Sequence, residues 1–153
     1  MIEQATIEQW LQDAGIESAE IEAEPASEYA WALGFKAPLD VAAAHKAVEH
    51  NHLLMQLTLN VSEEHEAALR ALGDEEREDF NFALRIALLE RPVGYQLTLA
   101  EDNDTVLKQL TFGINVYEDP LQRAGFFRRN HQLQSAALLA AVMVRRLAQL
   151  GKW

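Results

Sequence analysis

The feature that most constrains this chain is an apolar stretch near its C-terminus. Residues 136–144 read AALLAAVMV, and this run lies within residues 119–150, which have the spacing of one long helix. A helix that is apolar on every side has to be covered on more than one side. We therefore expect the preceding chain to cover one side of this helix.

Two apolar stripes follow the helix at about 100° per residue. The first consists of Leu121, Ala124, Phe127, Leu138 and Val142, and the second of Phe126, Leu133, Ala137, Ala140, Val144 and Leu147. Either both stripes belong to the core of one chain, or the second stripe forms a dimer interface or a groove for a partner. Because two-fold dimers are the commonest oligomers, we favour the second alternative.

Length and composition indicate an ordinary folded protein. At 153 residues with 49% hydrophobic residues, the chain can bury a core, and we expect a single α+β domain over residues 1–153. No repeat or linker interrupts it. The absence of cysteine removes disulfides and thiolate metal sites, and it fits a reducing compartment.

Charge and hydropathy bound the location and the partners. The net charge of −11 argues against nucleic acid, which requires a positive face. The longest apolar run, residues 136–144, is about half of the ~20 residues that a membrane-spanning helix needs. No basic region followed by an apolar run marks a signal peptide. We expect a cytoplasmic protein that does not bind membranes.

Hydrophobic periodicity predicts the elements before the last helix. We expect helices at residues 2–14, 62–72 and 74–90, and strands at residues 19–24, 28–37, 41–49, 53–61, 95–99 and 106–116. Residues 41–49 (VAAAHKAVE) have helical propensity, but they lie between two strands joined by short turns, and we interpret them as a strand.

This order of elements predicts an α+β fold. Strands joined by short turns pair antiparallel. We therefore expect an antiparallel sheet of five or six strands, with the N- and C-terminal helices packed on it and a helical segment inserted mid-sheet.

Capping residues and apolar stripes refine the predicted starts and the predicted burial of the helices. Ser62 and Asp74 are predicted N-caps, and Asp119 with Pro120 marks the start of the last helix. The helix at residues 74–90 carries Phe82, Ile86 and Leu89 in addition to a first apolar stripe, which predicts that it is more buried than a surface helix.

Candidate chemical sites are few. His50 and His52 form an H-x-H pattern, yet a zinc site needs three or four convergent ligands, and we interpret them as turn histidines. Residues 101–104 lack the glycine and glutamate of a calcium loop. Arg123, Arg128 and Arg129 are best explained as solvated or paired with carboxylates. We predict no catalytic residues, no metal and no cofactor.

A family resemblance accompanies these patterns. Residues 57–69 (LTLNVSEEHEAAL), 75–89 (EEREDFNFALRIALL) and 116–127 (VYEDPLQRAGFF), with the order of elements, resemble an uncharacterised bacterial and archaeal family of the type III secretion chaperone-like fold. The resemblance implies a small acidic homodimer whose apolar grooves hold an extended segment of a client protein.

We therefore predict a non-catalytic protein-binding module, a homodimeric chaperone-like or adaptor protein. The expected partner or dimer contacts are aromatic and apolar: Phe126, Phe127, Leu133, Ala137, Val144, Trp31 and Phe35. The alternative is a small-molecule sensor whose pocket lies between the sheet and the last helix and is lined by Tyr29, Trp31 and Phe112.

Overall fold

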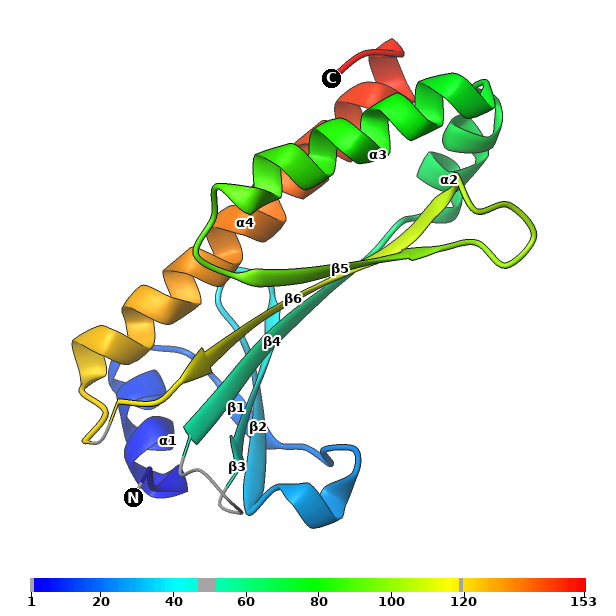
Figure 1. Cartoon of the computed structure of the whole chain (residues 1–153). Helices are drawn as coiled ribbons and strands as arrows, with labels where there is room; N and C mark the ends of the chain where they lie inside the picture. Colours follow the sequence, from blue (N-terminus) through cyan, green and yellow to red (C-terminus); the bar gives the residue numbers. More distant parts are fainter. Residues whose placement is uncertain (1, 47–51, 119) are drawn as a thin grey trace. The chain divides into compact units, whose positions relative to one another are not determined.

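The computed structural model describes residues 2–46, 52–118 and 120–153 and has the predicted α+β architecture (Figure 1). In chain order the elements are α1 (Gln4–Asp13), β1 (Ser18–Glu20), the short 3-10 helix η1 (Ala26–Glu28), β2 (Trp31–Lys36), β3 (Asp40–Lys46), β4 (His52–Asn60), α2 (Glu63–Arg70), α3 (Asp74–Leu89), β5 (Gly94–Leu99), β6 (Leu107–Val116) and α4 (Arg123–Leu150).

The six strands form one antiparallel sheet in the order β1-β2-β3-β4-β6-β5. Strand β3 confirms the prediction for residues 41–46, while residues 47–49 lie outside the described part of the chain. Ala43 pairs with Leu33 on β2 and with Met55 on β4, and all three side chains are buried. These neighbours on both sides outweigh the helical propensity of the alanines.

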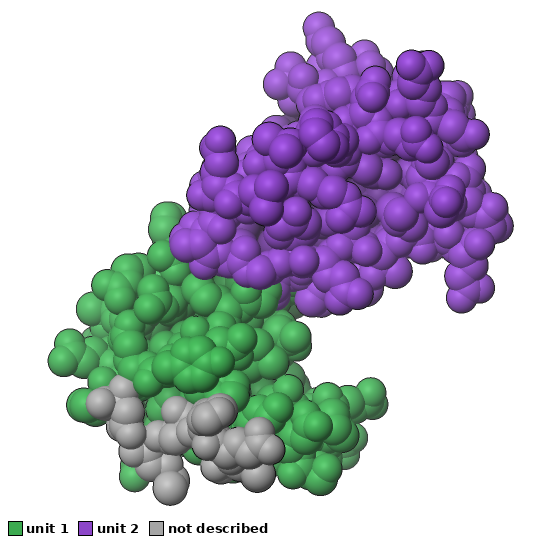
Figure 2. All heavy atoms as spheres, in the orientation of Figure 1, with its two compact units in different colours: residues 1–57, 113–134 green, residues 58–112, 135–153 purple. Residues whose placement is uncertain are grey.

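The chain divides into two compact units (Figure 2). Unit 1 comprises residues 1–57 and 113–134, and unit 2 comprises residues 58–112 and 135–153. Strands β4 and β6 and helix α4 each contribute residues to both units. The single domain expected over residues 1–153 stays a prediction.

Phe126 is the centre of the aromatic core of unit 1. Its ring is fully buried, with centroids 6.0 Å from Trp10 and 5.8 Å from Phe35. Next to this core, Gln134 of α4 accepts a hydrogen bond from the Leu39 N–H (3.1 Å) and donates one to the Leu39 carbonyl (3.0 Å). The part of α4 that belongs to unit 1 is thereby attached to the β2–β3 turn.

The core of unit 2 is formed by α3, the second half of α4 and the inner face of β6. Its buried apolar residues include Phe80, Leu84 and Leu88 of α3, Leu110 and Phe112 of β6, and Ala140, Val144 and Leu147 of α4. The members from each helix recur at three- and four-residue spacing, so one face of each helix is buried.

The face of α3 opposite its buried face contradicts one prediction from the sequence. Phe82, Ile86 and Leu89 are 66%, 47% and 68% exposed, so the expectation that this helix is more buried than a surface helix is wrong. The second set of apolar residues on α3 meets solvent because it lies on the far side of the helix from Phe80 and Leu84.

The predicted helix starts agree with the structure only in part. Ser62 is confirmed as a cap, since its hydroxyl accepts a hydrogen bond from the His65 N–H (3.2 Å). Asp74 is the first residue of α3 and binds Arg77 rather than capping the helix. Helix α4 begins at Arg123, three residues after Pro120, and Asp119 lies outside the described residues.

We predict that Phe126→Ala lowers the free energy of unfolding by about 3–5 kcal/mol, because it leaves a cavity among Trp10, Phe35 and Phe127. Phe127→Ala is the matched control. Phe127 is only partly buried, so its loss should be on the order of 1 kcal/mol. Urea unfolding followed by circular dichroism measures both, and equal losses would contradict the assigned core.

Candidate functional site

Unit 2 contains an apolar groove with a volume of about 410 Å³. The end of β4, one residue of β6, the start of α2 and the second half of α4 form its walls. The residues that line this β4–α4 groove are Leu59, Asn60, Val61, Ser62, His65, Leu110, Leu138, Ala141, Val142, Val144 and Arg145.

The strand side of the β4–α4 groove has a free backbone edge. The Val61 N–H donates to the Lys108 carbonyl (2.9 Å). Because the hydrogen-bonding direction alternates along an antiparallel strand, the backbone N–H and C=O of Asn60 point away from β6. The last residue pair between β3 and β4 is Val41 with Leu57, so Asn60 lies beyond the end of that pairing.

The helix side supplies apolar surface and one cation. Leu138 and Val142 are one turn apart on α4, and each is 46% exposed. Arg145 follows on the same side of the helix, and it forms no ion pair with any described residue. Although the chain has 24 acidic residues, none of the described residues that line the groove is acidic.

The seven predicted contact residues lie mainly in the cores. Phe35, Phe126, Leu133, Ala137 and Val144 are buried, and Trp31 and Phe127 are partly buried. Among them, only Val144 lines the β4–α4 groove. The second apolar stripe of α4 therefore belongs to the cores of the two units. The first stripe is the one that presents Leu138 and Val142 to solvent.

The three residues expected to line a ligand pocket do not line the β4–α4 groove. Tyr29 lines a different cavity, of about 270 Å³, in unit 1. Trp31 stacks on His45 with ring centroids 5.6 Å apart, and Phe112 is fully buried.

The alternation at residues 53–61 did place Leu59 and Val61 on one face of a strand. It contained no signal that α4 leaves that end of the face uncovered.

A buried polar cluster in unit 2 was missed by the sequence reasoning. The guanidinium of Arg77, at 5% exposure, donates to the Thr105 hydroxyl (2.9 Å) and to carbonyls at the end of α2, including Leu69 (3.0 Å), and it pairs with Asp74. Asn81 donates to the Thr105 carbonyl (3.0 Å). These contacts satisfy buried backbone groups, so the cluster has a structural role. The position of Arg77 three residues before Phe80 was the available signal.

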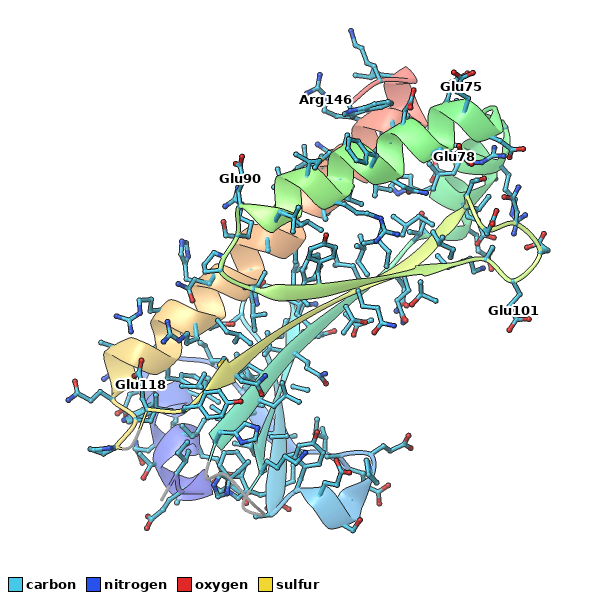
Figure 3. The ribbon with its side chains drawn as sticks, viewed as in Figure 1. Glu75, Glu78, Glu90, Glu101, Glu118 and Arg146 are labelled. Carbon is cyan, nitrogen blue, oxygen red and sulfur yellow. The ribbon has the colours of Figure 1, made fainter. Side chains whose placement is uncertain are left out.

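The other charged residues of unit 2 pair at the surface. Arg70 binds Asp102 (2.8 Å) on the β5–β6 turn and Glu66 (3.0 Å), and Lys108 also binds Glu66 (2.7 Å). Hydrogen bonds from Lys108 and Arg70 lower the pKa of Glu66, and those from Arg70 lower the pKa of Asp102. On the same turn, Figure 3 shows Glu101 pointing away from the ribbon.

The arginines at the start of α4 follow the predicted pairing in part. Glu118 binds Arg129 (3.0 Å) and Arg128 (3.3 Å), and Figure 3 shows it at the entry to α4. Arg123 lies over the Phe127 ring at 5.8 Å from its centroid. These contacts explain the arginines without a phosphate ligand.

The described histidines show no metal-site geometry. In the described ranges, no three His, Asp or Glu side chains are grouped to hold a metal ion. His52 packs on Tyr117 with ring centroids 5.0 Å apart, and His50 lies outside those ranges. Nor does any helix within the same ranges have the length and hydropathy to cross a membrane.

Asp74 provides a test of the buried cluster. Its pKa lies below the ordinary value of 3.8 because Arg77 and Thr105 bind the carboxylate. A lowered pKa in the folded state stabilises the protein above pH ~4, and this contribution is lost as the pH falls through the folded pKa. We predict that between pH 6 and pH 3 Asp74→Asn loses less stability than the wild type, as measured by urea unfolding.

The control is Glu75→Gln, which removes the same charge one residue away. Glu75 has no ion pair among the described residues, so its variant should keep the acid sensitivity of the wild type. Parallel pH profiles for the wild type and Asp74→Asn would refute the role assigned to this carboxylate.

Comparison with known proteins places this fold in a family. A crystal structure of an uncharacterised protein from Methanothermobacter thermautotrophicus is similar over 94% of this chain and 96% of that chain, with a TM-score of 0.83 and 23% identity. No curated protein matches the chain, and neither comparison links it to secretion chaperones. The model of the family described as uncharacterized conserved protein (DUF2299) matches residues 3–144. The chain therefore belongs to the DUF2299 family.

Proposed function

We propose that this protein is a non-catalytic protein-binding module, a small acidic homodimer that holds an extended client segment as a chaperone-like or adaptor protein. The observation that carries the proposal is the apolar surface that unit 2 leaves uncovered, in the β4–α4 groove and on α3. Contiguous apolar surface of this kind is typical of sites where proteins interact.

The placement of the polar groups supports a binding role. The buried guanidinium of Arg77 is fully engaged with Asp74, Thr105 and backbone carbonyls, and Glu66 and Asp102 are held by surface ion pairs. These titratable groups connect elements to one another and do not converge on the β4–α4 groove. The walls of the groove are mostly apolar, with backbone and amide groups available for hydrogen bonds.

The exposed face of α3 is suited to a second copy of the chain. Phe82, Ile86 and Leu89 follow each other at four- and three-residue spacing and form one stripe. Glu78 and Arg85, seven residues apart, lie together along one flank of this α3 stripe. Figure 3 shows the acids Glu75 and Glu90 pointing outward at the two ends of the helix.

Charge favours an antiparallel pair of α3 helices. In an antiparallel pair related by a two-fold axis, each flank of one helix faces the same flank of the other. If Phe82 packs against Phe82 of the second copy, Glu78 of each copy faces Arg85 of the other. Two equivalent ion pairs then border the apolar contact, and the opposed helix dipoles are compatible with it. In the described part of the chain, Glu78 and Arg85 form no other ion pair.

The expected dimer is weak. Three large apolar side chains from each copy make a small interface, below the range of a permanent dimer. Each copy also carries a net charge of −11, so repulsion opposes association at low salt. We expect a dissociation constant on the order of 10–100 µM.

We predict that Glu78→Arg and Arg85→Glu each weaken dimerisation about tenfold, because each places like charges across the interface. The double variant Glu78→Arg/Arg85→Glu should restore the wild-type dissociation constant, since the pairs are re-formed with reversed sign. Sedimentation equilibrium at about 0.15 M salt measures all three. Glu64→Arg, at an exposed position of α2, is the control and should leave the constant nearly unchanged.

Two results would reject the α3 interface. The first is a wild-type protein that stays monomeric at several hundred micromolar. The second is a double variant that dimerises no better than the two single variants.

The alternative function, small-molecule binding, has one favourable observation. The volume of the β4–α4 groove, about 410 Å³, falls within the ~300–1,000 Å³ that small-molecule sites occupy. Native mass spectrometry of the purified protein tests this candidate. A stoichiometric small ligand that is lost in Val142→Asp would favour the sensor over the client-holding protein.

A further inference from the structure

The β4–α4 groove specifies the chemistry of its occupant more closely than client binding in general. The identity of this occupant rests on the proposed function, because the groove is the same. Its walls differ: β4 offers a backbone edge at Asn60, α4 offers the apolar side chains of Leu138 and Val142, and Arg145 supplies a positive charge.

The backbone edge selects an extended segment. The N–H and C=O of Asn60 point away from β6, beyond the final β3–β4 pair formed by Val41 and Leu57. An added strand satisfies such groups through main-chain hydrogen bonds, which give affinity without depending on sequence. The free edge is short, because Val61 faces β6 and the Ser62 carbonyl accepts a hydrogen bond from the Glu66 N–H (2.8 Å), so only a few residues of a client can pair there.

The apolar side chains of the groove favour a segment in which apolar and polar residues alternate. In an extended segment paired with β4, side chains on one face recur about every 6.6 Å. One such side chain would lie against Leu59 and Leu138, and the next against Val61 and Val142, while the intervening side chains point to solvent. A segment of alternating apolar and polar residues therefore fits this groove better than an amphipathic helix does.

The positive charge of Arg145 favours an acidic residue in the bound segment. Among the described residues that line the groove, Arg145 is the only permanent cation and none is acidic. Arg145 has no ion pair within the same part of the chain. Four other arginines, Arg70, Arg77, Arg128 and Arg129, already bind carboxylates of this chain. A carboxylate on the bound segment can make a charge-assisted hydrogen bond to this guanidinium.

We infer that the β4–α4 groove binds an extended peptide segment that pairs with the free edge of β4, places alternate aliphatic side chains between β4 and α4, and bears a carboxylate that binds Arg145.

A peptide of defined sequence tests this inference with the full chain. The probe is a fluorescein-labelled heptapeptide with blocked ends, Thr-Leu-Thr-Leu-Thr-Leu-Asp, and fluorescence anisotropy measures its dissociation constant. A matched peptide ends in Asn instead of Asp. We expect the acidic peptide to bind the wild type at least fivefold more tightly. Methylation of the threonine amides should weaken binding by at least the same factor. With leucines opposite Leu59 and Val61, a threonine lies opposite Asn60 in an antiparallel pairing and donates its N–H to the free edge.

Two neighbouring arginines supply a matched pair of variants. Arg145→Gln should abolish the preference for the acidic peptide, because the affinity for that peptide falls to the level of the Asn peptide. Arg146→Gln removes the same charge one residue along α4, at a side chain outside the lining of the groove (Figure 3), and should retain the preference.

The outcomes separate the inference from the proposed function. If neither peptide binds at millimolar concentration, the client-holding function is rejected together with the inference. If both peptides bind equally, and Val142→Asp abolishes that binding, the function stands and the carboxylate is rejected. Equal loss of the preference in Arg145→Gln and Arg146→Gln also overturns the role of Arg145.

Discussion

Burial of one face of α4 is the constraint on which the remainder of the structure depends. The helix has 28 residues, and Phe126 and Leu133 enter the core of unit 1 whereas Ala140, Val144 and Leu147 enter the core of unit 2. Alanines at the middle of this face let neighbouring elements approach closely, and the large side chains at either end fill the wider space. Each unit is therefore organised around a different section of the same helix.

Polar side chains complete the packing at places where the backbone turns inside a unit. Gln134 satisfies both backbone groups of Leu39 in unit 1, and Arg77 satisfies carbonyls at the end of α2 in unit 2. An unsatisfied buried carbonyl or N–H costs about 1–3 kcal/mol, so these side chains make the two turns compatible with burial. Their engagement also explains why buried polar residues in this fold are structural, while the proposed binding site is mostly apolar.

The distribution of charge connects this architecture to the proposed function. Acidic residues outnumber basic ones in a chain with a net charge of −11, yet the described residues that line the β4–α4 groove include no acid and one arginine. A local cation in an acidic molecule attracts an anionic group while the remaining surface repels nonspecific polyanions. The α3 stripe, bordered by Glu78 and Arg85, carries both signs and is suited to a copy of itself.

Much of the fold was predictable from local patterns. Period-two alternation at residues 28–37 and 53–61 and the 3.6-residue period of α4 identified the elements, because each pattern records which side of an element is apolar. The same patterns could not decide which apolar side is covered. The sequence alone favoured the second stripe of α4 as the open one, and it predicted that Phe82 and Leu89 are buried. Only the tertiary structure decided these points, because coverage depends on the neighbours that surround a helix. Leu138 and Val142 of α4 and Phe82 of α3 stay exposed, whereas Ala140 and Leu84 of the same helices are buried.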